Sequence, residues 1–264
     1  MKASYISLFL LTVLPELACH AQDKVQEQAN ILMIAVDDLN DWVGILRGHP
    51  QARTPNIDRL AAKGVLFANA HAQAPICNPS RASIMTSLYP ASTGIYFNAG
   101  AIAESPAARK NIVMPRRFEK EGFHVSGAGK LFGGPQDEKY IPDYGGSFGG
   151  FGPLPEKKLS GFDGVRLWDW GAYPDRDEEM PDYKVAAWAV QQLEAGQSQP
   201  FFLAVGFHRP HVPLYAPQEW FDSYPLESIQ LPSVHATDME DLPPYVTSLR
   251  RYLPRAHARL DSKA

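Results

Sequence analysis

The chain has 264 residues, a formal net charge of −4, 45% hydrophobic residues and 11% aromatic residues. This length allows one large domain or two small ones, and the apolar content is enough to fill a substantial core. There is no run of basic residues, so the charge gives no reason to expect nucleic acid or an anionic membrane surface as a partner.

The N-terminus has the pattern of a secretory signal peptide covering residues 1–21. Lys2 supplies the positive start, residues 5–14 are apolar, and Ala21 precedes the expected cleavage point. An apolar run of this length is too short to cross a bilayer of about 30 Å, so we expect no transmembrane anchor. The pattern predicts a periplasmic or secreted protein, and a lipoprotein acylated at Cys19 is the alternative.

The first part of the mature chain predicts a strand, a helix and a second strand. Residues 29–36 form a continuous apolar run typical of a strand buried on both faces, and the run ends in Asp37 and Asp38. A helix follows Thr54, its expected N-cap, and ends before Gly64. Residues 65–73 then have the composition of a second strand.

The later segments repeat this alternation. We expect helices from about residue 78 to 89, over 114–121 and over 181–195, and strands over 123–130 and 199–211. A Gly- and Pro-rich stretch from 133 to 155 predicts a surface loop. Together these segments predict an α/β fold with a mostly parallel sheet flanked by helices.

Polar residues follow three of the expected strands. Asp37 and Asp38 end the first, Lys130 ends the second, and His208 lies near the end of the last. In an open α/β sheet the ligand site lies outside the carboxyl ends of the strands. We therefore expect these side chains to converge at one edge.

Cys77 stands in the stretch "PICNPSR" and has no disulfide partner, because Cys19 lies in the segment that is removed. Most free cysteines are buried and inert, which is the simplest interpretation of a lone thiol. Here, however, a helix is expected to start near Asn78, so that Cys77 lies at a helix N-terminus with Arg81 one turn on, and that arrangement favours an anion. A thiolate nucleophile would suit the same place, but the two aspartates indicate a hard cation instead.

The residues Cys77, Pro79, Ser80 and Arg81 resemble the C-x-P-S-R signature of type I sulfatases. The stretches "VDDLN" (36–40), "GKLF" (129–132) and "GFHRPHVPLYAP" (206–217) are also similar to sulfatase segments, the last to the iduronate-2-sulfatase branch. The resemblance covers residues 29–220, which would be the N-terminal part of the catalytic domain, and leaves 221–264 as a tail of uncertain structure.

The resemblance implies a set of site residues and partners. Cys77 would be converted to formylglycine by a formylglycine-generating enzyme, and Arg81, Lys130 and His208 would hold the sulfate group. Asp37, Asp38 and residue 77 would bind a metal ion, for which Ca²⁺ suits carboxylate ligands better than Mg²⁺ with its stricter geometry. The substrate would be a sulfated carbohydrate.

Each of these residues also has an ordinary interpretation when it is taken alone. Two aspartates after a strand are common in turns, a lone arginine is usually solvated, and a lysine often ends a strand. His208 and His211 could both be loop histidines. Only the joint occurrence, in order and at strand ends, favours a site.

The chain departs from the sulfatase pattern at three places. Gly133 stands where the family's lysine segment usually has a histidine, and "MTS" (85–87) replaces L-T-G. No later Asp–His or Asp–Asn pair follows to complete the metal site, nor is a second lysine evident. We therefore expect a truncated sulfatase domain that by itself binds calcium weakly and has little activity.

These patterns leave three functional hypotheses. The first is a sulfuric ester hydrolase acting on a sulfated sugar or glycan. The second is a related phosphodiesterase or phosphonate monoester hydrolase with the same nucleophile and metal site. The third is a non-catalytic, sulfatase-like glycan binder.

Overall fold

The computed structural model describes residues 28–134, 137–162, 166–232, 237 and 240–249, so the predicted signal peptide lies outside the described residues. The strands are β1 (Ile31–Val36), β2 (His124–Gly129), β3 (Asp143–Tyr144), β4 (Trp170–Ala172), β5 (Phe201–Phe207) and β6 (Leu214–Ala216). The α-helices are α1 (Pro55–Ala61), α2 (Cys77–Thr86), α3 (Pro90–Thr93), α4 (Met114–Lys120), α5 (Pro181–Ala195), α6 (Gln218–Asp222) and α7 (Pro244–Leu249). Short 3₁₀ helices are η1 (Ile102–Glu104), η2 (Ala108–Lys110), η3 (Asp137–Tyr140), η4 (Asp177–Glu179) and η5 (Leu226–Ser228).

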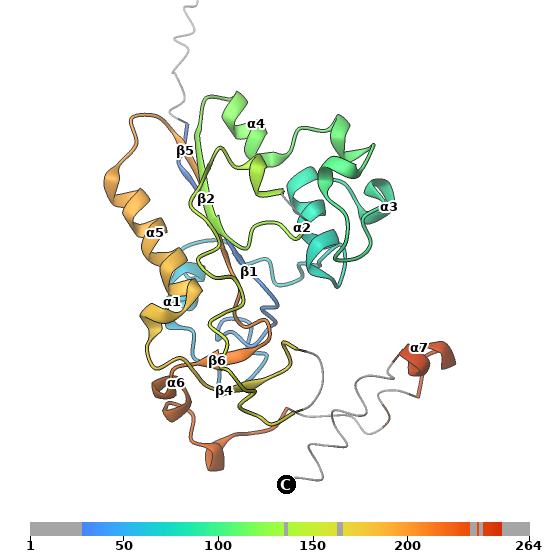
Figure 1. Cartoon of the computed structure of the whole chain (residues 1–264), viewed down its shortest axis with the longest axis vertical. Helices are drawn as coiled ribbons and strands as arrows, with labels where there is room; N and C mark the ends of the chain where they lie inside the picture. The colour runs from blue at the N-terminus through green and yellow to red at the C-terminus, as the bar shows by residue number, and fades with distance from the viewer. Residues whose placement is uncertain (1–27, 135–136, 163–165, 233–236, 238–239, 250–264) are drawn as a thin grey trace, which may run out of the picture.

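The main sheet has the strand order β1-β5-β2-β3, and all three of its pairings are parallel. Strands β4 and β6 form a separate parallel pair. In Figure 1, α5 lies on one side of the sheet and α2 and α4 on the other. The predicted α/β class with a mostly parallel sheet is confirmed.

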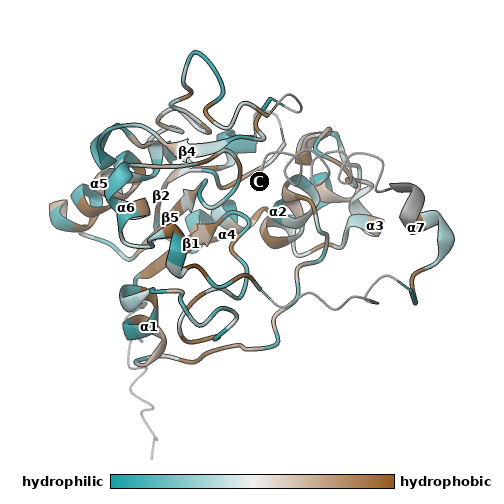
Figure 2. Ribbon diagram, turned by 90° about the horizontal axis from the view of Figure 1, so that it is seen from below, coloured by the Kyte–Doolittle hydropathy of each residue, from teal (hydrophilic) through white to brown (hydrophobic). Residues whose placement is uncertain are grey.

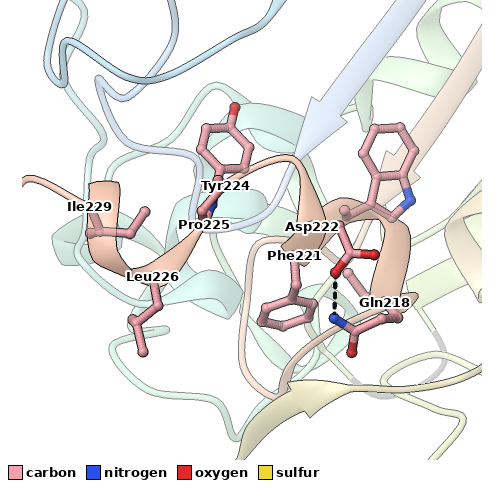
Figure 3. Close-up of a pocket in the computed structure, with 9 residues that line it drawn as sticks. Gln218, Phe221, Asp222, Tyr224, Pro225, Leu226 and Ile229 are labelled. Atoms are coloured by element: carbon pink, nitrogen blue, oxygen red, sulfur yellow. Dashed lines mark hydrogen bonds between the residues drawn. The ribbon is translucent and has the colours of Figure 1, made fainter.

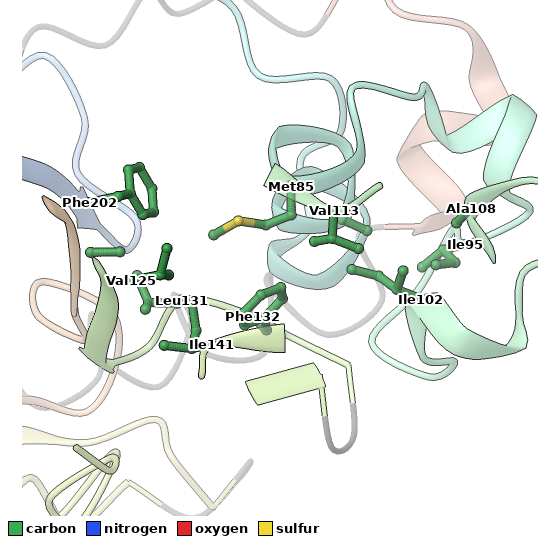
Figure 4. Packing of buried hydrophobic residues seen from close by; sticks show 12 residues of the cluster. Met85, Ile95, Ile102, Ala108, Val113, Val125, Leu131, Phe132, Ile141 and Phe202 are labelled. Atoms are coloured by element: carbon green, nitrogen blue, oxygen red, sulfur yellow. The ribbon is translucent and has the colours of Figure 1, made fainter. Parts of the chain in front are cut away.

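The larger core lies between the sheet and the helices α2 and α4. Figure 4 shows Met85 of α2 extending toward Val125 and Phe202 on the strands. The ring of Phe118 on α4 stacks on that of Phe202, with the centroids 4.4 Å apart. This packing fixes α2, and therefore its N-terminus, against the sheet.

The smaller core lies between the sheet and α5. This helix carries both hydrophilic and hydrophobic residues (Figure 2), and its Val185 and Ala189 pack on Ala128, Leu203 and Val205 of the strands. Strand β5 is buried over its five central residues because helices cover it on both faces, as expected for a parallel sheet. Both layers hold the strand ends in place.

The predicted strand over residues 65–73 is wrong. These residues form turns and irregular structure, and Val65 and Phe67 are 80% and 79% exposed. A short apolar run becomes a strand only where a neighbour pairs with its backbone, and no pairing is found for this segment among the described residues.

Strand β1 is not buried on both faces, contrary to what its apolar run predicts. It is the edge strand of the main sheet, and its Leu32 and Ile34 are 45% and 49% exposed.

Three smaller expectations also change. Thr54 makes no side-chain cap, because its hydroxyl accepts the N–H of Gly44 and bonds Asp58 instead. Helix α2 stops at Thr86, since Ser87 takes a left-handed conformation with φ 58°. The loop expected over 133–155 contains η3 and β3.

In the tail, α6 runs to Asp222, and η5 and α7 follow, whereas residues 250–264 lie outside the described part. Among the described residues, no helix combines the length and the apolar character needed to cross a membrane.

Candidate functional site

The carboxyl ends of β1, β5 and β2 lie side by side and carry the predicted polar residues. Val36 is in register with Phe207, and Gly129 with Gly206, so the residues that follow each strand emerge at one edge. Asp37, His208 and Lys130 occupy these positions. The parallel topology therefore brings them together, as the sequence predicts.

Asp37, Arg81 and Lys130 form a buried cluster, here called the charge trio. Arg81 Nη2 donates to Asp37 Oδ1 at 2.9 Å, and Lys130 Nζ donates to Asp37 Oδ2. A second guanidinium nitrogen of Arg81 donates to the backbone carbonyl of Lys130. The three side chains are only 5% (Asp37), 8% (Arg81) and 9% (Lys130) exposed, so Arg81 is not the solvated helix residue that it could have been.

The charge trio carries one more positive than negative charge. Burial by itself raises the pKa of Asp37, but the hydrogen bonds and charges of Lys130 and Arg81 lower it further than burial raises it. Asp37 therefore stays ionised and neutralises one of the two cations. An excess positive charge in a buried place favours binding of an anion.

Cys77 is the first residue of α2 and lies between two cavities. One, of about 450 Å³, is lined by Asp37, Asp38, Cys77 and Arg81 among others. The second, of about 320 Å³, is lined by Cys77, Lys130 and His208 among others. Residue 77 is thus exposed to both groups of charged side chains, at a helix end whose free N–H groups favour negative charge.

Asn98 connects the α2 N-terminus to the loop after α3. Its Oδ1 accepts the Cys77 S–H at 3.5 Å and the backbone N–H of Asn78 at 3.4 Å. Asn78 is itself fixed, because its side-chain amide donates to the backbone carbonyls of Phe97 and Gly100 at 3.1 and 2.9 Å. These bonds orient residue 77 toward the cavities.

Two of the three predicted metal ligands, Asp37 and residue 77, lie close together with one further donor, His211. One oxygen of Asp37, the sulfur of Cys77 and one ring nitrogen of His211 lie within 4.8 Å of one another. Asp38 has φ 56°, which turns the chain after β1, and its Oδ2 is 3.8 Å from His211 Nε2. The two carboxylates and an oxygen-bearing side chain at position 77 are hard donors of the kind that Ca²⁺ or Mg²⁺ takes. The residues fit a divalent cation, and the ligand set of Asp37, Asp38 and residue 77 stays a prediction.

His208 is buried at the end of β5 beside an acidic residue that sequence reasoning missed. The carboxylate of Asp182 accepts the backbone N–H groups of His208 and Arg209, both at 2.8 Å. The ring of Phe151 meets the His208 imidazole edge-on, 5.0 Å away, and lies 4.7 Å from the Lys130 ammonium. Phe151 thereby packs against two of the predicted sulfate-binding residues.

Gly133 is required by close packing. A Cβ atom at this position would lie 2.6 Å from the Cα of Asn78 and 2.9 Å from its backbone nitrogen. The loop after Lys130 therefore rests directly on the first turn of α2, and no side chain fits there. Glycine is therefore compatible with this packing, at the position where the resemblance to sulfatases implies a histidine.

The largest of the described cavities lies away from Cys77. It has a volume of about 740 Å³ and is formed by residues of α6, η5 and their flanks (Figure 3). Its lining residues are Ala216, Gln218, Trp220, Phe221, Asp222, Tyr224, Pro225, Leu226 and Ile229. This cavity brings none of the predicted site residues together.

The sequence alone did not point to Asn98 or Asp182 as site residues. Asn98 is 21 positions from Cys77 and Asp182 is 26 from His208, and neither stands in a recognisable motif. The one available signal was that Asp182 occupies the first turn of a helix, where an acid is common for other reasons.

Comparison with known proteins now identifies the family. A family model described as "Sulfatase" matches residues 29–254. The chain belongs to the sulfatase family. A sulfatase of Formosa agariphila is 44% identical to it over 92% of this chain and 52% of its own length. Iduronate 2-sulfatase of Mus musculus is 36% identical over 81% of this chain and 41% of its own length. The chain thus spans about half the length of the curated relatives it matches.

A solved structure supports the fold of this sulfatase-family chain. The phosphonate monoester hydrolase of Silicibacter pomeroyi superposes with a TM-score of 0.55, covering 89% of this chain and 60% of that one. At 19% identity the likeness shows a shared fold alone.

Proposed function

We propose that the protein hydrolyses sulfate esters of a sugar or glycan, with residue 77 as the attacking group. The observation that carries the proposal is the charge trio beside Cys77. Two cations share one carboxylate in a buried place, next to a helix N-terminus, and this arrangement suits a bound anion.

Arg81 and Lys130 keep donors free for the sulfate group. An ammonium has three N–H donors and a guanidinium has five. One donor of Lys130 and two of Arg81 are used within the charge trio and its backbone. The remaining donors can bind sulfate oxygens and stabilise the negative charge that shifts during cleavage of the S–O bond. His208, on the other side of Cys77, would hold the ester from the second cavity.

Two further components are part of the proposal. Formylglycine made from Cys77 would supply a hydroxyl nucleophile, and Ca²⁺ bound by Asp37, Asp38 and residue 77 would neutralise oxygen charge. The proposal includes a formylglycine-generating enzyme as a partner in maturation. It also places the protein in the periplasm or outside the cell, as the pattern of residues 1–21 predicts.

The name of one relative supports a substrate class for the proposal. One of them carries the name iduronate 2-sulfatase, which indicates a sulfated sugar acid for that protein. We propose a sulfated carbohydrate for this one, without assigning the sugar or the position of its sulfate.

The test compares two substrates on the natural protein expressed with a formylglycine-generating enzyme. Release of 4-nitrophenol is followed from an aryl sulfate and from an aryl phosphodiester. We expect turnover of the sulfate, and a decrease of roughly 10²-fold for Lys130→Met, the scale expected when an oxyanion-stabilising group is lost. Lys110→Met is the matched control, because Lys110 is exposed at the end of η2.

The outcomes separate the three hypotheses. Faster turnover of the phosphodiester would support the phosphonate hydrolase alternative. Binding of a sulfated glycan without turnover, when residue 77 is converted, would support a non-catalytic binder. An equal effect of the Lys130 and Lys110 substitutions would contradict the assigned role of Lys130.

A further inference from the structure

Asp182 joins two elements next to His208, which lines the second cavity. It lies in the first turn of α5, and its two carboxylate oxygens accept the N–H groups of the two residues that follow β5, His208 and Arg209. Burial raises the pKa of Asp182, but hydrogen bonding with His208 and Arg209 lowers it further, so the residue stays ionised. A half-buried carboxylate is thus held in place beside the His208 ring.

The imidazole of His208 has one nitrogen that faces this carboxylate. His208 Nδ1 is 3.6 Å from Asp182 Oδ1, and the two side chains are 6% and 18% exposed. At that separation the contact is electrostatic rather than a direct hydrogen bond. Nδ1 is accordingly one of two buried side-chain polar atoms that lack a hydrogen-bond partner among the described residues.

The position of the ring proton follows from this geometry. In a neutral imidazole one nitrogen carries the proton and the other carries a lone pair. A lone pair on Nδ1 would face the negative charge of Asp182, whereas an N–H there is attracted to it. The tautomer with hydrogen on Nδ1 is therefore favoured, and it leaves Nε2 as the unprotonated nitrogen.

We propose that Asp182 is a positioning residue that fixes the tautomer and the orientation of His208. It ties the backbone of His208 to α5 and keeps the ring proton on Nδ1, so that Nε2 is the nitrogen available to a group in the cavity next to Cys77. Phe151 supports the same orientation from the ring edge. The proposal rests on the proposed function only for the identity of that group, a sulfate ester.

The tautomer can be measured directly on the 264-residue chain. Histidine is labelled with ¹⁵N, the two ring nitrogens are identified by two-bond ¹H–¹⁵N correlation, and His208→Gln assigns the His208 signals. We expect the pattern of hydrogen on Nδ1 in the wild type and loss of that pattern in Asp182→Asn. Asp182→Glu, which retains the charge, should recover it at least in part. Glu194→Gln, an exposed acid on the same helix, is the matched control and should leave the spectrum unchanged.

The wild-type spectrum tests the proposal even if a variant fails to fold. Hydrogen on Nε2 of His208 in the wild type would overturn the proposal. So would an unchanged pattern in Asp182→Asn, provided that its backbone amide spectrum is that of a folded chain. The measurement needs no turnover, so failure of the sulfatase proposal would not be mistaken for failure of this one.

Discussion

Removing the charge of Asp37 should destabilise the fold more than removing either cation. Asp37→Asn keeps the shape of the side chain but leaves the buried Arg81 and Lys130 without a counter-charge. Breaking one buried ion pair in this way costs about 3–5 kcal/mol, and here two pairs are lost, so we expect about 5 kcal/mol. Lys130→Met leaves a neutral Asp37–Arg81 pair and should cost about 1.5–3 kcal/mol, the scale of one hydrogen bond to a charged group.

The free energy of unfolding is measured by urea titration in buffer without divalent cations or sulfate. Either ligand would bind the native state and add stability of its own. Glu119→Gln is the matched control, because it neutralises one partner of an ion pair to Arg116 that is exposed and therefore worth less than about 1 kcal/mol. If Asp37→Asn costs no more than Lys130→Met, the reasoning on the charge trio is refuted.

Three further predictions concern other parts of the chain. Burial raises the pKa of Asp169, but hydrogen bonds from Ser160, Tyr215 and Leu159 lower it further. The ionised Asp169 should therefore stabilise the fold above roughly pH 3.9, the ordinary pKa of an aspartate, and this stabilisation should be lost as the pH falls below that value. In pH-dependent melting, the advantage of the wild type over Asp169→Asn should therefore shrink in acid; a constant difference would contradict this. Gly133→Ala should cost about 1–3 kcal/mol in a thermal melt because the added Cβ overlaps Asn78, whereas Gly64→Ala has room and serves as the control. Leu32→Lys with Ile34→Lys should reduce self-association in light scattering, because both apolar side chains are exposed on the edge strand β1; unchanged association would show that this edge is not responsible.

The main strands and their polar ends could be predicted because both depend on local patterns. β1 and β5 are apolar runs that form parallel neighbours, and a parallel sheet brings their carboxyl ends to one edge. Only β5 is buried on both faces, because β1 lies at the edge of the sheet. The strand expected over 65–73 failed for the opposite reason. Its apolar residues satisfy the composition of a strand, but pairing depends on neighbours that are distant in the chain, and Val65 and Phe67 remain exposed.

The sequence could name residues of the candidate site, but it could not predict the contacts between them. Arg81 and Lys130 were expected beside the sulfate group, yet their shared bonds to Asp37 depend on how α2 and β2 pack, which no motif records. The same holds for Asp182, whose partner follows a different strand. Gly133 differs, because the motif shows that a side chain is missing and the structure shows that the loop there packs directly on Asn78.

The chemical state of residue 77 is the most direct test of the central claim. The natural protein is expressed with a competent formylglycine-generating enzyme and digested, and the peptide containing Cys77 is weighed by mass spectrometry. We predict a peptide lighter than the thiol form by about 18 Da, the difference between a cysteine and its aldehyde, a product distinct from the acids of ordinary cysteine oxidation. An unmodified thiol at position 77 under those conditions would contradict the account.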